Sequence, residues 1–351
     1  MLLIVSIILL SILALLPDAD VDHDAGYTAS ELSIRETVDG SVISTSHVNP
    51  DGVITDAIDM GYATVCRMQD DDDRVVEERY LDANGYPVAR YENFHGLSYE
   101  YDETSTMITY LDVEGNPIIC SDGYSTIVRT QVDGRAYDDF FYDLNGQQVQ
   151  CSGGYYGLRR GYNAEGQNIS LAFLDKDGHA VRTSSGYAIK TYQRDSEGTV
   201  IGERYFDTEG KPVKSSLGQY GELYQRNEQG YISQITYLDL DGNPAPTNAG
   251  YTILKCTYHR DGTADTDMYF DANGNPKALS KGQYGIKRSG KVNLLLDRNG
   301  NVMPCVDNLL NGFLCMVVVL GCVVCLLIIA LPKSLSVVRT VVYIAFILYE
   351  N

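Results

Sequence analysis

One short phrase recurs along the chain at a nearly fixed interval. It has the form D-x-x-G, and eight copies align at spacings of 30, 31, 32, 32, 32, 32 and 26 residues. Periods in this range are typical of arrays of one repeated supersecondary unit. We therefore expect the repeat itself to be the fold. The aligned pairs are Asp82/Gly85, Asp112/Gly115, Asp143/Gly146, Asp175/Gly178, Asp207/Gly210, Asp239/Gly242, Asp271/Gly274 and Asp297/Gly300.

Fixed columns of residues flank each copy and predict β-strands. An aromatic residue lies two positions before nearly every Asp, and Leu, Phe or Tyr lies one position before it. Neighbours in a strand point to opposite faces, so one column should fill a core and the other should lie on the opposite surface. Asp at the first turn position and Gly at the fourth suit a type I turn followed by a bulge. The sequence thus predicts β-hairpins.

A second turn marks the other half of most copies. Stretches such as 162–169 and 192–201 contain it, and most are preceded by a Gly-Tyr pair such as Gly186-Tyr187 or Gly250-Tyr251. We expect each unit to run strand, turn, strand, turn, short strand. The predicted fold is an all-β repeat array, a β-hairpin meander or solenoid.

Charge and hydropathy divide the chain into segments. The formal charge is −20, and nearly all of it lies between residues 17 and 307. Residues 308–331 are uncharged and long enough for a transmembrane helix, whereas the apolar run within residues 1–17 is shorter and suits a signal peptide or signal anchor. Residues 337–351 read as the start of a second, possibly truncated, span.

The basic residues near these segments predict an orientation. Lys333 and Arg339 follow the predicted span, and positive charge beside a span stays on the cytoplasmic side. Residues 61–303 are then extracellular tandem hairpin repeats at the cell membrane, and residues 18–60 are an acidic linker or N-terminal cap. A surface this acidic disfavours nucleic acid.

The phrase G-Y-x(4–6)-Y-x(3–5)-G-x(6)-[YF]-[LF]-D-x-x-G-x-P, found at 186–212 and 250–276, resembles bacterial cell-surface Tyr/Gly hairpin repeats. It is similar in style to YD repeats and to cell-wall and glucan-binding repeats. The latter have units of about 20 residues and use tryptophan, which this chain lacks. The last fifteen residues faintly resemble the start of VanZ-like membrane proteins. The resemblance implies an extracellular binding role.

The chain shows no catalytic constellation. Its five histidines are scattered, and no zinc-ligand spacing, nucleophile elbow or phosphate-binding glycine loop occurs. We therefore expect no enzyme activity in the repeat region, although a membrane domain beyond the last residue would leave this open. Residues 174–179, 238–243 and 270–275 resemble calcium loops, but a plain turn explains their Asp and Gly residues. We expect no cofactor.

Tyrosine is the best candidate for a contact residue. Its ring can stack on a sugar or surround a cation, although strands also use tyrosine for cross-strand packing. We expect packing for about two thirds of the tyrosines, with the exposed remainder binding ligand. The candidates are Tyr205, Tyr237 and Tyr269, together with Tyr187 and Tyr251 of the Gly-Tyr column.

Two cysteines occupy equivalent positions in adjacent units. Cys120 and Cys151 each lie eight residues after their repeat's Asp, so a disulfide between them is an alternative to two thiols. Taken together, the sequence predicts a membrane-anchored, extracellular bacterial repeat protein that binds cell-envelope polysaccharide or another surface ligand, such as a surface protein. The alternatives are a non-binding spacer and an accessory ectodomain of a truncated VanZ-like membrane protein.

Overall fold

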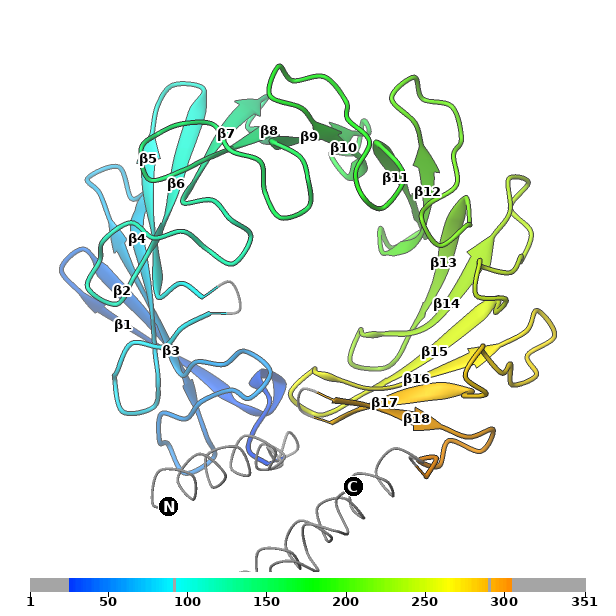
Figure 1. Cartoon of the computed structure of the whole chain (residues 1–351). Coiled ribbons are helices and arrows are strands. Elements are labelled where there is room, and N and C mark those ends of the chain that lie inside the picture. The colour runs from blue at the N-terminus through cyan, green and yellow to red at the C-terminus, as the bar shows by residue number, and fades with distance from the viewer. Residues whose placement is uncertain (1–24, 91–92, 290–291, 305–351) are drawn as a thin grey trace, which may run out of the picture. The chain divides into compact units, whose positions relative to one another are not determined.

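The computed structural model of the chain describes residues 25–90, 93–289 and 292–304. All of the strands lie in the first of two compact units, which ends at Asn301. Within the described residues there are eighteen strands, and each pairs antiparallel with the next strand of the chain, as the run of colours in Figure 1 shows. The predicted all-β meander of hairpins is confirmed.

The elements follow one another at regular intervals. They are η1 (Ala29–Glu31), β1 (Ser33–Asp39), β2 (Val42–Val48), β3 (Thr64–Gln69), β4 (Val75–Leu81), β5 (Gly96–Tyr101), β6 (Ser105–Leu111), β7 (Thr126–Val132), β8 (Arg135–Tyr142), β9 (Gly157–Tyr162), β10 (Asn168–Leu174), β11 (Ile189–Arg194), β12 (Val200–Phe206), β13 (Gly221–Arg226), β14 (Ile232–Leu238), β15 (Ile253–Tyr258), β16 (Ala264–Phe270), β17 (Gly285–Ser289) and β18 (Val292–Leu296).

Each repeat of about 32 residues contains two strands rather than the three that the sequence predicted. After β12, the turn from Asp207 to Gly210 folds the chain back, but only Pro212 forms a bridge, to Phe206. The same single bridge occurs where Gln148 or Ala180 replaces proline, and a second turn begins at Ser215, soon after the bridge. The expected third strand is therefore reduced to a single bridge inside the connection between hairpins.

The turn chemistry is as predicted. The Oδ1 atom of Asp207 accepts hydrogen bonds from the backbone N–H groups of Glu209 and Lys211, both at 2.9 Å. Gly210 has φ of 78°, the left-handed conformation that glycine adopts without strain. The same two contacts recur at Asp143 and Asp271, so the recurrent Asp stabilises the turn.

The aromatic columns form one continuous core, which we call the aromatic ladder. Rings from the column before the Asp alternate with rings from the Gly-Tyr column, and neighbouring centroids lie 4.3–6.0 Å apart. Such distances are those of favourable ring pairs. The ladder stops at Gln219 and resumes with Tyr237, Tyr251 and Tyr269. Its first run is Tyr62, Tyr80, Phe94, Tyr110, Tyr124, Phe141, Tyr155, Phe173, Tyr187 and Tyr205.

Both faces of the sheet carry buried residues. Tyr237 is 3% exposed in the ladder, and its neighbour Leu238, which points to the opposite face, is 1% exposed. The expectation that the two columns serve opposite faces is thus confirmed.

Two kinds of hairpin alternate along the array, so the residue pattern repeats every two hairpins. From β4 to β16, every second even-numbered strand carries an acidic residue two positions before its ladder ring. The strands between them, β6, β10 and β14, carry Ile or Leu there. The strand after each acidic one begins with glycine. The acidic residues are Glu78, Asp139, Glu203 and Asp267, and the glycines are Gly96, Gly157, Gly221 and Gly285.

Several sequence predictions concern residues at or beyond the ends of this sheet. Residues 33–48, from the predicted linker or cap, form the hairpin β1–β2, and every residue of β1 is exposed. Among the described residues no helix has the length and hydropathy needed to cross a bilayer. The predicted segments 1–17, 308–331 and 337–351 lie outside those residues.

Candidate functional site

The tyrosines predicted to bind ligand belong to the aromatic ladder. Tyr205, Tyr237 and Tyr251 are 4%, 3% and 9% exposed, while Tyr187 and Tyr269 are half-buried. The expectation that these rings are exposed is therefore wrong for the first three. Tyr187 and Tyr251 each pack between two ladder rings, while Tyr205, Tyr237 and Tyr269 each pack against one.

Cys120 and Cys151 carry thiols, and no disulfide joins them. Both side chains are buried in one cluster with Tyr124 and Phe141. The disulfide alternative is thus wrong for this structure. A cysteine in such surroundings packs as a small apolar group.

The predicted calcium-like loops serve as turns. Asp175, Asp177 and His179 place one donor atom each within 4.8 Å of one another. The Oδ1 atom of Asp175 already accepts the backbone N–H groups of both other residues at 2.9 Å. Three donors fall short of the six to eight oxygens that calcium takes.

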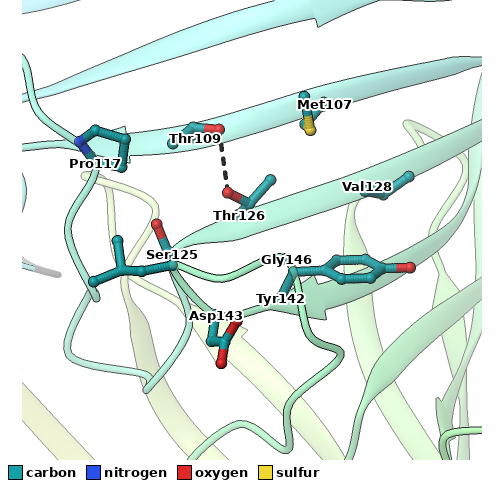
Figure 2. Close-up of a pocket in the computed structure, with 10 residues that line it drawn as sticks. Met107, Thr109, Pro117, Ser125, Thr126, Val128, Tyr142, Asp143 and Gly146 are labelled. Atoms are coloured by element: carbon teal, nitrogen blue, oxygen red, sulfur yellow. Dashed lines mark hydrogen bonds between the residues drawn. The ribbon is translucent and has the colours of Figure 1, made fainter.

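A shallow pocket of about 380 Å³ lies on the sheet face opposite the ladder. Strands β6 and β7 form its floor with two facing pairs, Met107 with Val128 and Thr109 with Thr126. Figure 2 shows these side chains along the two strands. Their alternation with the ladder residues follows from the two-residue period of a strand.

The pocket wall comes from the connections and from the end of β8. Tyr142 is the last residue of β8, and Asp143 and Leu144 continue into the D-x-x-G turn. Leu144 is 52% exposed. The remaining lining residues are Pro117, Ser125 and Gly146. The pocket therefore depends on three consecutive strands and on two of the repeated turns.

Polar groups in the pocket include one without a partner. The hydroxyls of Thr109 and Thr126 are hydrogen-bonded at 3.2 Å (Figure 2). Ser125 is 1% exposed, and its Oγ has no hydrogen-bond partner among the described residues. Buried hydroxyls are normally paired, so the Ser125 hydroxyl is an unsatisfied polar group beneath the pocket surface.

The carboxylate of Asp143 is ionised at neutral pH. Hydrogen bonds from the backbone N–H groups of Gln147 and Asn145 lower its pKa and outweigh the opposite effect of burial. Both of those bonds go to Oδ1, each at 2.8 Å. The pocket thus combines an aromatic ring, apolar side chains, hydroxyls and one negative charge.

This combination suits a small neutral ligand that carries both C–H and O–H groups. Ligand sites are generally apolar hollows of about 300–1,000 Å³ with a few placed polar groups. The pocket was not predictable from a motif, because its residues come from three strands and their connections. One signal was available, since Tyr142 replaces the usual Leu or Phe just before the Asp.

Comparisons with known proteins add little to this picture. No protein-family model matches the chain, and no curated protein matches it. A porin-like protein from Bacteroides uniformis is 11% identical over 70% of this chain and 91% of its own, with a TM-score of 0.25. The structure described as TcdB2-TccC3-TEV is 14% identical over 79% of this chain and 17% of its own, with a TM-score of 0.20. The resemblance to YD and cell-wall repeats thus remains a prediction, and the VanZ-like stretch lies outside the described residues.

Proposed function

We propose that the chain is a non-catalytic protein of the bacterial cell surface whose hairpin array binds a neutral cell-envelope polysaccharide. The observation that carries the proposal is the pocket on β6, β7 and β8, in which Tyr142 and apolar side chains lie beside hydroxyls and a carboxylate. An aromatic ring supplies an apolar surface to the C–H groups of a sugar, while the polar groups accept and donate to its hydroxyls.

The charge of the chain favours this class of ligand over others. The net charge of −20 repels anionic polymers such as nucleic acid. A neutral polymer of many identical sugars can also rebind at high effective concentration, so a shallow site could hold it. Membrane attachment through residues 308–331 belongs to the same proposal and would place the array outside the cell.

The test is retention of the full chain on insoluble cell-wall material and on neutral glucans, with Val128→Lys as the altered protein. Lys255 occupies the equivalent position on β15, so the fold already accepts lysine there. The expected result is at least tenfold weaker retention, because the long side chain fills the pocket. Thr191→Lys is the matched control at the equivalent position on β11 and should retain wild-type binding. Equal retention of both variants, or none by the wild type, would reject the proposal.

The aromatic ladder favours a second candidate, a spacer that holds a partner domain at a distance. This second candidate is supported by the burial of Tyr205 and Tyr237, which shows that the repeated aromatic residues are used in packing. Deletion of residues 189–252 would remove two consecutive hairpins and keep the alternation of hairpin kinds. A spacer should then become shorter while remaining folded, and no ligand should be lost.

A further inference from the structure

Two residues at β13 depart from the usual repeat. Gln219, just before the strand, replaces the aromatic residue found in most units of the Gly-Tyr column, as Gln283 does before β17. Glu222 replaces the apolar residue that faces the acidic residue of the preceding strand. In the other three acidic hairpins the facing pairs are Glu78 with Leu97, Asp139 with Leu158 and Asp267 with Ile286.

These two departures contact each other. The side-chain amide of Gln219 donates to Oε1 of Glu222 at 3.1 Å, and the hydroxyl of Tyr224 donates to Oε2 at 3.1 Å. Glu222 lies directly opposite Glu203 in the register of β12 and β13. Side chains at facing positions of antiparallel strands have Cβ atoms about 4.5–5.5 Å apart, and like charges there are destabilising.

The cluster has fewer positive charges than negative ones. Lys190 lies 3.0 Å from Oε1 of Glu203, and the donors to Glu222 are neutral. By contrast, Asp139 lies 2.8 Å from Arg129 and 2.7 Å from Arg160. The cluster thus holds two carboxylates and one ammonium group among aromatic side chains, where an uncompensated charge is costly.

Gln219 is 2% exposed, and its Oε1 has no hydrogen-bond partner among the described residues. Gln283, at the equivalent position before β17, has the same unpaired Oε1, so this feature belongs to the glutamine and not to the pair of carboxylates. A proton bound at Glu222 would remove the excess negative charge. Burial raises the pKa of Glu222; hydrogen bonds from Tyr205, Gln219 and Tyr224 act against this, and Glu203 adds to the rise.

We propose that Glu203 and Glu222 form a proton-binding site that makes the junction between β12 and β13 sensitive to pH. One proton from solvent binds a Glu222 carboxyl oxygen and is shared with the facing carboxylate of Glu203, while Lys190 balances the remaining charge. When the proton leaves, two negative charges face each other across the junction. Only three residue pairs join these strands, so repulsion there opens the junction readily.

The other charged and titratable groups around Glu203 and Glu222 keep one protonation state between pH 5 and pH 8. On β11, burial lowers the pKa of Lys190, but Glu203, Tyr192 and Tyr187 together raise it by more, so the lysine stays charged. The positive charge of Arg160 on β9 lowers the pKa of Tyr192. Burial raises the pKa of every surrounding phenol, so these stay neutral: Tyr187, Tyr192, Tyr205, Tyr224, Tyr237 and Tyr251.

The direction of the effect follows from the raised pKa. An acid that binds its proton more tightly in the folded state destabilises that state when ionised. The junction should therefore become more stable as pH falls from about 8 toward the ordinary Glu pKa of about 4.3. Carboxylates whose pKa is lowered in the folded state make that state less stable as pH falls, but only below this range.

The experiment is hydrogen exchange of the full chain at pH 8 and pH 5, corrected for intrinsic exchange rates. We expect opening at β12–β13 to fall about tenfold at pH 5, while opening at the equivalent junction β4–β5, where Glu78 faces Leu97, stays unchanged in the same sample. Glu222→Leu, which restores the residue type of the other junctions, should give the low opening at both pH values. Glu222→Gln should do the same, and the infrared difference between wild type and this variant at pH 5 should show a protonated-carboxyl band that belongs to the wild type.

Each other outcome overturns the proposal. A pH response at β12–β13 that survives both substitutions would assign it to other groups. No response in the wild type would mean that solvent keeps Glu222 ionised without cost. If replacing choline by potassium at constant ionic strength suppressed opening at pH 8 in the wild type, a metal cation rather than a proton would fill the site.

Discussion

The ring of Phe141 on β8 stacks on the ring of Tyr124 from the preceding connection, with centroids 4.4 Å apart and planes 11° apart. Phe141 is 3% exposed and Tyr124 is 6% exposed. Tyr124 also packs against Tyr110 of β6, so its ring joins two consecutive hairpins, β5–β6 and β7–β8, whose backbones pair along β6 and β7. Ring packing of this kind links each unit to the next through the ladder.

Phe141→Ala should be strongly destabilising because it leaves a cavity between two ladder rings. Large-to-small changes of buried phenylalanine cost about 3–5 kcal/mol. Urea unfolding followed by circular dichroism measures the loss. Tyr86→Ala is the control, because Tyr86 is 69% exposed and its removal should change the midpoint little. Equal effects of the two substitutions would show that the ladder does not stabilise the array.

Asp139→Asn should be destabilising at neutral pH because it leaves Arg129 and Arg160 without their shared carboxylate. Removing one partner of a buried ion pair costs about 3–5 kcal/mol. Burial raises the pKa of Asp139, but hydrogen bonds from the two guanidiniums lower it by more. Its contribution is therefore present above the unfolded pKa of about 3.9 and is lost as pH falls below that value.

The measurement is the unfolding midpoint of wild type and variant at pH 7 and at pH 2.5. The difference between them should be large at pH 7 and should shrink in acid. Asp138→Asn is the neighbouring control, since the partner of Asp138, Arg159, is 39% exposed and solvent screens the pair. A difference that does not change with pH would contradict the assigned role of Asp139.

Asp207→Ala should weaken its turn, whereas Asp207→Asn should preserve it, because the amide oxygen can still accept the two backbone N–H groups. The pKa of Asp207 is lowered, first by the hydrogen bond from the N–H of Lys211. Stability from this carboxylate is thus present above the ordinary Asp pKa and lost below the lowered value. Both variants lack the titrating carboxylate, so thermal unfolding between pH 7 and pH 2 should show reduced acid sensitivity for both, and only the Asn variant should keep near wild-type stability at pH 7.

The repeat made much of this fold predictable. The spacing of Asp and Gly predicted the turns, and the aromatic columns predicted strands with two occupied faces. Exposure of Tyr205 and Tyr237 could not be judged from their positions, since burial depends on the next hairpin and its connection. The two-unit period was present in the sequence as Glu78-x-Tyr80, Asp139-x-Phe141, Glu203-x-Tyr205 and Asp267-x-Tyr269, but the stronger 32-residue period obscured it.

Gly157, the first residue of β9, illustrates the packing that this two-unit period requires. A Cβ atom there would lie 2.3 Å from the carbonyl oxygen of Asp139 and 2.8 Å from Cδ1 of Phe140. Phe140 faces Gly157 in the register of β8 and β9, so its ring covers the space that the glycine leaves. The equivalent position in the next hairpin, Ile189, carries a side chain.

Gly157→Ala should therefore cost about 1–3 kcal/mol through overpacking. Hydrogen exchange of β8 and β9 should localise the damage to their junction. Thr126→Ala, at the equivalent position on β7, removes atoms instead of adding them and should leave the β8–β9 exchange unchanged. The double variant Gly157→Ala with Phe140→Ala should not recover stability, because the closest clash is with backbone. Recovery in the double variant would show that the Phe140 ring, and not the Asp139 carbonyl, excludes a side chain at this position.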